Sequence, residues 1–225
     1  MNQKNDFREY AVKHLGMSGN ALDDYNKKVS NMTPYVIMES NAHFRPVDVF
    51  TKLIDDRIIF LGLPIDDYIG NLITAQLLYL ETSDKNADIL MYINSPGGHI
   101  TDGLAVYDTM NYIKPDIATL CTGMAASMSA VLLASGTKGK RGALKHSRIM
   151  IHQAHGGAIG QVADMKIQLK QAEELQHDLY EILSETTGQA YETIQKDADR
   201  DFWMRPPAAK DYGLIDKIYL KNNAQ

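Results

Sequence analysis

The sequence has very little cysteine and no excess of positive charge. Cys121 is the single cysteine among 225 residues, so neither an intrachain disulfide nor a cysteine-based zinc site can form. The 28 Asp and Glu residues outnumber the 23 Lys and Arg residues, which are scattered along the chain. We therefore expect a protein of a reducing compartment that does not bind nucleic acid.

Long hydrophobic runs are also missing. No segment approaches the roughly 20 consecutive apolar residues that a membrane-spanning helix needs, and residues 1–20 contain no apolar core of a signal peptide. These absences predict a cytoplasmic protein without a membrane partner. Residues 1–32 are polar and have no sustained apolar repeat, so we interpret them as an N-terminal arm or propeptide. Residues 33–225 are then expected to form a single domain.

Short apolar runs alternate with amphipathic segments along the rest of the chain. The runs are rich in β-branched residues and have the length of buried strands: residues 56–62, 88–94, 116–123 and 147–153. Residues 66–81 and 100–114, which separate the first three runs, carry apolar side chains at helical spacing. Strand, helix, strand, helix is the pattern of βαβ units, so we predict an α/β fold with a mainly parallel sheet.

The longest predicted helix runs from Asp164 to about Ser184, with Gly188 as a C-terminal stop. Its apolar side chains recur every three or four residues: Met165, Leu169, Ala172, Leu175, Leu179 and Ile182. Two interpretations are open at this point. The apolar stripe packs on its own domain, or it reaches another subunit.

A serine that could act as a nucleophile follows one of the predicted strands. In the segment TGMAASMSAVLLASG, Ser127 falls in the first turn of a predicted helix, where unpaired backbone N–H groups can stabilise an oxyanion. Ser127 could instead simply cap that helix. The glycine turn NSPGG, residues 94–98, could supply a second oxyanion donor, although an ordinary strand-to-helix turn has the same composition.

Candidates for a general base and its partner lie further along the chain. His152 ends the apolar strand RIMIHQ, and imidazole titrates near neutral pH, but His155 is a competitor. A carboxylate that orients the imidazole could come from Asp197, Asp199 or Asp201. Nothing in the local sequence chooses among these three acids.

Taken together, these segments resemble the Clp proteolytic subunit family, ClpP, from about Tyr35 to Tyr219. The resemblance is carried by YINSPGG, YDTM, GMAASM, GTKGKR, SRIMIHQ, GGAIGQ, DRDFWM and YGLID. It implies that Ser127 is the nucleophile, His152 the base and Asp201 the third member of a serine endopeptidase triad. It also implies that the backbone N–H groups of Gly98 and Met128 form the oxyanion hole.

The resemblance further implies a particular fold and assembly. The fold would be a ClpP/crotonase-like spiral of βαβ units with a protruding handle helix at about residues 164–184, which interdigitates with an opposite ring. Two stacked seven-membered rings would receive unfolded polypeptides from an AAA+ unfoldase of the ClpX or ClpA/ClpC type. ATP would bind that partner, and this chain would bind no cofactor and no metal. The chain departs from the family's usual residues at Lys145, His146 and Ala154.

Two other functions are compatible with parts of this pattern. A crotonase-like acyl-CoA hydratase or isomerase would share the spiral fold and the paired oxyanion amides, but it would not need Ser127, His152 and Asp201 together. A noncatalytic ring subunit that supports an active paralogue would not need them either. Catalysis of peptide hydrolysis is therefore the function that the sequence favours.

Overall fold

The computed structural model describes residues 35–40 and 43–220, which belong to two compact units. The first unit extends to Asp55 and contains an antiparallel hairpin of β1 (Tyr35–Ser40) and β2 (His43–Asp48), followed by α3 (Val49–Asp55). The predicted arm or propeptide, residues 1–32, lies outside the described residues. Its boundary with the following domain therefore stays a prediction.

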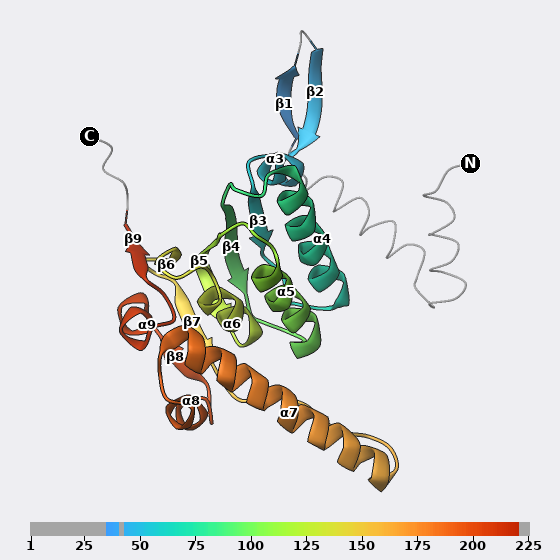
Figure 1. The fold of residues 1–225 in the computed structure, drawn as a ribbon, viewed down its shortest axis with the longest axis vertical. Coiled ribbons are helices and arrows are strands. Elements are labelled where there is room, and N and C mark those ends of the chain that lie inside the picture. Colours follow the sequence, from blue (N-terminus) through green and yellow to red (C-terminus); the bar gives the residue numbers. More distant parts are fainter. Residues whose placement is uncertain (1–34, 41–42, 221–225) are drawn as a thin grey trace. The chain divides into compact units, whose positions relative to one another are not determined.

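The second unit, from Asp56 onward, is built on a seven-stranded sheet (Figure 1). Parallel pairing runs through β3 (Ile58–Leu61), β4 (Ile89–Ser95), β5 (Ile117–Ala126), β6 (Arg141–Leu144) and β9 (Lys217–Tyr219). β7 (Arg148–Ile151) also pairs parallel with β5, and β8 (Phe202–Met204) pairs antiparallel with β7. The predicted α/β fold with a mainly parallel sheet is confirmed.

The described helices of this unit are α4 (Asp67–Ser83), α5 (Ile100–Tyr112), α6 (Met128–Ala134), α7 (Val162–Thr187), α8 (Tyr191–Asp197) and α9 (Pro206–Tyr212). Apolar spacing predicts α4, α5 and α7. Asp66 is the N-cap of α4, and its carboxylate accepts the Ile69 N–H at 2.8 Å. Among the described residues, no helix combines the length and the apolar character needed to cross a bilayer.

Helix α7 is packed on its own unit only near its C-terminal end. Its buried residues are Leu179, Tyr180, Ile182 and Leu183. Towards the other end, Ile167 and Leu169 are 69% and 58% exposed, and in Figure 1 this end extends away from the sheet. The 26 residues correspond to a helix about 39 Å long at 1.5 Å per residue. A predicted apolar stripe along the whole helix is thus only partly covered within the chain.

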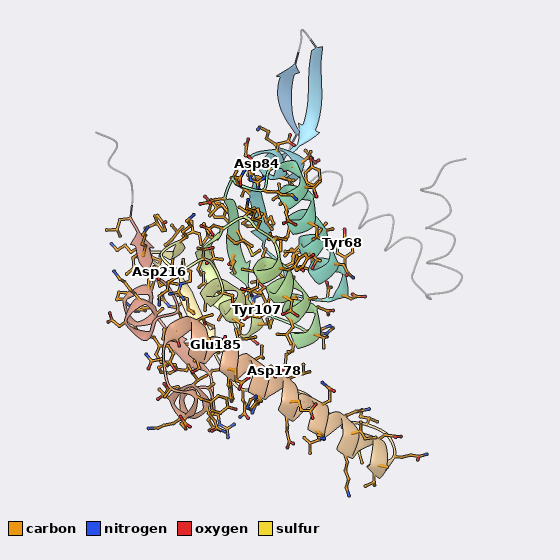
Figure 2. All side chains as sticks on the ribbon, in the orientation of Figure 1. Tyr68, Asp84, Tyr107, Asp178, Glu185 and Asp216 are labelled. Atoms are coloured by element: carbon orange, nitrogen blue, oxygen red, sulfur yellow. The ribbon has the colours of Figure 1, made fainter. Side chains whose placement is uncertain are left out.

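A buried ion pair connects the ends of several elements. Arg141 on β6 donates two hydrogen bonds, of 3.0 and 2.7 Å, to the carboxylate of Asp216, which lies next to β9. Figure 2 labels Asp216. The same guanidinium donates to the carbonyls of Ala134, at the end of α6, and Thr186, near the end of α7. Burial alone would raise the pKa of the Asp216 carboxyl, but the hydrogen bonds from Arg141 outweigh it and hold that pKa below 3.8.

Replacing Asp216 with asparagine is expected to destabilise the fold by about 3 kcal/mol or more at neutral pH, because the Arg141 charge stays buried without its partner. Since the Asp216 pKa is lower in the folded state, its stabilisation is complete well above pH 3.8 and is lost as the pH falls through the folded value. Denaturant unfolding at several pH values measures this difference, with exposed Asp211→Asn as the control. A wild-type advantage that does not shrink in acid would contradict this role of Asp216.

Candidate active site

Strand β5 changes its neighbour along its length, and this brings Ser127 next to β7. Residues 119–121 of β5 pair with β6, whereas residues 124–126 pair with β7. The contact continues one residue further, because the Ser127 N–H donates to the Met150 carbonyl at 2.9 Å. His152 directly follows the end of β7. The parallel register of two strands therefore places Ser127 close to His152.

The short strand β8 brings an acidic side chain to the same place. It pairs antiparallel with β7 so that Phe202 lies opposite Ile151. The next residues along this register are His152 and Asp201, which must therefore also lie opposite each other. Nδ1 of His152 lies 3.2 Å from Oδ1 of Asp201, and Nε2 of His152 lies 2.9 Å from Oγ of Ser127. One imidazole thus contacts both the hydroxyl and the carboxylate.

The His152 and Asp201 side chains differ in their exposure to solvent. The His152 side chain is 15% exposed, whereas the Asp201 side chain is 56% exposed. An imidazole held this way can accept the Ser127 proton at Nε2 while Nδ1–H donates to the carboxylate, which fixes the tautomer. The arrangement is therefore able to activate a hydroxyl as a nucleophile.

The backbone at Ser127 makes a sharp turn between β5 and α6. Its φ of 56° and ψ of −129° are a strained combination for a residue other than glycine, costing on the order of 1–3 kcal/mol. Ser127 is the N-cap residue of α6, but its side chain makes no capping hydrogen bond. The alternative in which Ser127 serves as a helix cap is thus not supported. The expected helix start was too early, because β5 continues to Ala126 and includes Met124.

The glycine turn lies against this nucleophile turn. A Cβ on Gly97, whose φ is 91°, would come within 2.5 Å of the Ala126 carbonyl oxygen and 2.7 Å of the Ser127 Cβ. A Cβ on Gly98 would come within 2.0 Å of the Ile65 carbonyl oxygen. Only glycine permits this close approach of three backbone segments.

Two backbone N–H groups are left available beside Ser127. Ile65 forms a parallel bridge at Gly98, in which Ile65 N–H donates to the Gly97 carbonyl and His99 N–H donates to the Ile65 carbonyl, each at 2.8 Å. In this pattern the N–H of Gly98 itself points away from Ile65. Met128 is the first residue of α6, so its N–H has no acceptor within the helix. Both amides that the sequence singled out could therefore donate to an oxyanion.

Two adjoining cavities lie near the contact between Ser127 and His152. The smaller, about 200 Å³, adjoins both of them, and most of its other lining side chains are apolar: Pro96, Ile100, Met128, Val131, Ile151, Leu179 and Leu183. The larger, about 580 Å³, lies between residues 98–101, residues 153–158 and the α7 residues from Gln168 to Gln176. The cavities share Gly98 and residues 153–155, so they form adjoining parts of one groove. An extended peptide chain fits such a shape.

The competing candidates have other contacts. The Asp197 carboxylate accepts the Tyr212 hydroxyl at 3.0 Å, and the Asp199 carboxylate lies 3.9 Å from Arg200. The His155 ring packs edge-on against the His152 ring at a centroid distance of 4.9 Å. Sequence reasoning did not identify Leu179 and Leu183 as parts of the site, because they lie on α7, far from Ser127 in the sequence, and carry no local signal of a site.

Comparison with known proteins identifies the family of this chain. Residues 40–222 match the family model for Clp protease. The chain belongs to the Clp protease family. It is therefore a serine peptidase, in a family whose named relatives form an ATP-dependent system.

Curated relatives match almost the whole chain. An "ATP-dependent Clp protease proteolytic subunit" of Porphyromonas gingivalis is 51% identical over 219 residues, covering 97% of this chain and 99% of the relative. Proteins of the same name from Bacteroides fragilis and Bacteroides thetaiotaomicron are each 50% identical over 217 residues, covering 96% of this chain and 99% of each relative.

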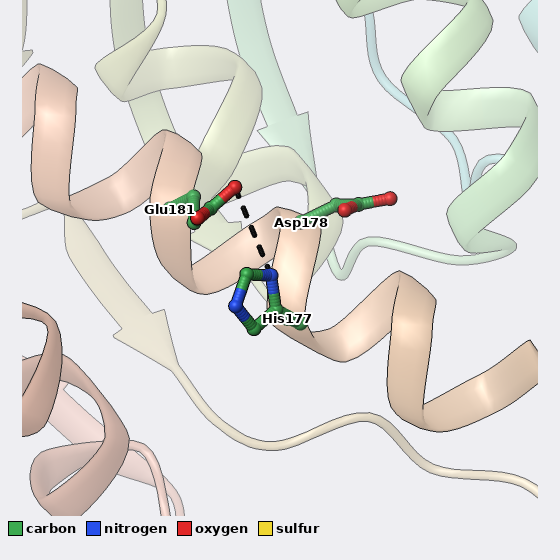
Figure 3. A group of neighbouring side chains, drawn as sticks. All are labelled: His177, Asp178 and Glu181. Atoms are coloured by element: carbon green, nitrogen blue, oxygen red, sulfur yellow. Dashed lines mark ion pairs between the residues drawn. The ribbon is translucent and has the colours of Figure 1, made fainter. Parts of the chain in front are cut away.

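A cluster of potential metal ligands occurs elsewhere, on α7. His177, Asp178 and Glu181 are exposed, and one ligand atom from each lies within 4.8 Å of the others (Figure 3). His177 and Glu181 form an ion pair one helical turn apart at 3.7 Å, and the His177 ring contacts Tyr191. Ordinary helix-surface interactions explain this cluster, so we infer no metal site from it. The buried Cys121 is no alternative nucleophile, because burial raises the pKa of its thiol.

Proposed function

We propose that the chain is a proteolytic subunit that hydrolyses peptide bonds of unfolded proteins, with Ser127, His152 and Asp201 as its catalytic triad. The observation that carries this proposal is the continuous set of contacts from the Ser127 hydroxyl through His152 to Asp201. The family supports it independently, because its members are peptidases. The chemistry needs no cofactor on this chain, and ATP would be used by the partner.

The proposed reaction proceeds through an acyl-enzyme. The Ser127 Oγ attacks the scissile carbonyl carbon while its proton moves to Nε2 of His152, and the carbonyl oxygen becomes an oxyanion. The N–H groups of Gly98 and Met128 donate to that oxyanion, and Asp201 stabilises the imidazolium. The C–N bond then breaks as His152 protonates the leaving amine. A water molecule repeats these steps on the acyl group and releases the carboxylic acid and Ser127.

The smaller cavity favours substrates with an apolar side chain before the scissile bond. Its lining includes Met128, Val131 and Leu183, and it adjoins Ser127. Burial of an apolar side chain contributes roughly 25 cal/mol per Å², whereas a charged side chain would lose its hydration without gaining a partner. We therefore expect cleavage after residues such as leucine or methionine rather than after aspartate.

We further propose that the subunit works in two stacked seven-membered rings fed by an AAA+ unfoldase such as ClpX or a ClpA/ClpC type, in the cytoplasm. Support comes from α7, whose end near Val162 carries apolar side chains that stay exposed among the described residues, including Ile167 and Leu169. Such a surface is typical of subunit contact. The names of the relatives, which include "ATP-dependent", support a partner ATPase.

The purified protein is expected to hydrolyse a fluorogenic peptide with leucine before the scissile bond, as a particle of about fourteen chains. The matched peptide with aspartate at that position should be cleaved at least about 10-fold more slowly, because the pocket is apolar. Steady-state kinetics and native mass measurement test both points. A particle of one or two chains would contradict the ring assembly, and acyl-CoA turnover without peptide hydrolysis would favour the crotonase-like alternative.

A further inference from the structure

Ser129 is a buried serine that takes no part in the reaction. Its hydroxyl contacts both the glycine turn, which carries the Gly98 amide, and the turn into α6, which carries the Met128 amide. The Ser129 side chain is completely buried, in the first turn of α6. Its Oγ lies 2.7 Å from the Ser95 carbonyl oxygen and 2.8 Å from the Ala126 carbonyl oxygen, and it accepts the Ala126 N–H at 2.8 Å. A hydroxyl has one proton, which either carbonyl can accept, and donation to Ser95 is the bond that links α6 to the turn after β4.

The glycine turn after β4, residues 94–98, is stabilised by hydrogen bonds of its own side chains. Ser95 is also completely buried, and its Oγ accepts the Gly97 N–H at 3.2 Å. The Asn94 side chain accepts the Met124 N–H at 3.1 Å, which adds a second connection to β5. These bonds fix the backbone that leads into Gly98. Ser129 therefore contacts a turn that is already internally ordered.

The position of the two amides relative to each other depends on such links. Gly98 follows β4, whereas Met128 begins α6, so no covalent geometry fixes the distance between their N–H groups. An oxyanion gains from both donors only when each lies within about 2.7–3.1 Å of the oxygen. Ser129 is adjacent to Met128, and Ser95 lies three residues before Gly98. A Ser129–Ser95 hydrogen bond consequently joins the two backbone segments that carry the donors.

We propose that Ser129 is a positioning residue, which sets the spacing of the Gly98 and Met128 amides through its hydrogen bond to the Ser95 carbonyl. This inference rests on the proposed peptidase function and deepens it. Ser129 touches neither the substrate nor the reacting atoms. Its contribution should appear where negative charge develops on the substrate oxygen, and not in the binding of the uncharged peptide.

Replacing Ser129 with alanine tests this role, since alanine fits the space and removes only the hydroxyl. We expect kcat for peptide hydrolysis to fall by roughly 10- to 100-fold while KM changes less than about threefold, because one oxyanion donor is displaced rather than removed. The affinity for a peptide boronate, whose adduct with Ser127 is tetrahedral and anionic, should fall by the same factor as kcat/KM. Affinity for the uncharged, noncleavable peptide of the same sequence should stay constant.

Ser135→Ala is the matched control, because Ser135 lies at the other end of α6, where its hydroxyl donates to the Val131 carbonyl within the helix. This variant should keep wild-type kinetics. If Ser129→Ala does not fold, Ser129→Cys decides the question by the same measurements, since a thiol occupies the same position but is only a weak donor to the Ser95 carbonyl.

Unchanged kcat and boronate affinity in a folded Ser129→Ala protein would overturn the positioning role, as would a rise in KM alone. Neither result would affect the proposed peptidase function. That function fails separately if the wild-type protein neither hydrolyses peptides nor forms a boronate adduct at Ser127, and the positioning role then fails with it.

Discussion

Replacing Ser127 with alanine is expected to lower peptide hydrolysis by about 10⁴-fold or more, with native mass unchanged. The magnitude follows from losing the nucleophile, after which only the oxyanion amides and substrate binding still accelerate attack by water. Removing the hydroxyl deletes the atom that lies 2.9 Å from Nε2 of His152. Alanine also fits the turn sterically, although it retains the strained φ of 56°. Steady-state kinetics of the leucine peptide measure the loss.

A fluorophosphonate probe gives an independent readout of the same variant. The wild-type protein should be labelled on Ser127, and peptide mapping by mass spectrometry should locate the adduct there. Denatured wild-type protein should not be labelled, because the hydroxyl is reactive only while His152 can take its proton. Ser135→Ala should label like the wild type. Equal labelling of the Ser127→Ala and wild-type proteins would show that the nucleophile has been misassigned.

Replacing Asp201 with asparagine is expected to lower kcat by roughly 10²- to 10⁴-fold with little change in KM. An asparagine amide can no longer stabilise the imidazolium, and it allows the tautomer with the proton on the wrong nitrogen. The lower part of this range reflects the 56% exposure of the Asp201 side chain, because water can partly replace the carboxylate. Kinetics at saturating peptide across a range of pH measure the effect.

The neighbouring acids provide matched controls for this variant. Asp199→Asn should retain activity close to the wild type, because its carboxylate contacts Arg200 and not His152. Asp197→Asn removes a charged acceptor of the Tyr212 hydroxyl and should mainly change stability. If Asp199→Asn or Asp197→Asn lost as much activity as Asp201→Asn, the antiparallel register of β7 and β8 would not explain the triad.

Periodicity predicted the main strands and helices well, because burial of one face imposes a regular pattern on the sequence. In α4, four of the apolar residues at helical spacing are buried, namely Ile69, Ile73, Leu77 and Leu80. Leu72 fits the same spacing but is 40% exposed, whereas Gly70 is buried. A pattern of apolar residues does not predict a buried glycine, but Gly70 lets α4 approach Asp102 of α5 closely.

The shorter strands were not predicted from periodicity. β8 and β9 each have three residues, which is too short for a pattern of alternation to emerge. β6 has the sequence RGAL, which contains no β-branched residue. β8 nevertheless determines where Asp201 lies, because its register opposes Phe202 to Ile151. The positive φ of Ser127 was likewise not predictable, since it results from the meeting of β5, β7 and the glycine turn.

The sequence by itself determined the alternation of strands and helices and the supply of a serine, histidines and acids with suitable chemistry. The local sequence did not distinguish Asp197, Asp199 and Asp201 as partners of the histidine, and only the resemblance to a family selected Asp201. The tertiary structure decided which side chains are neighbours, joining His152 to residues 25 and 49 positions away. The physical reason is that strand register is a long-range property, set by the packing of the whole sheet.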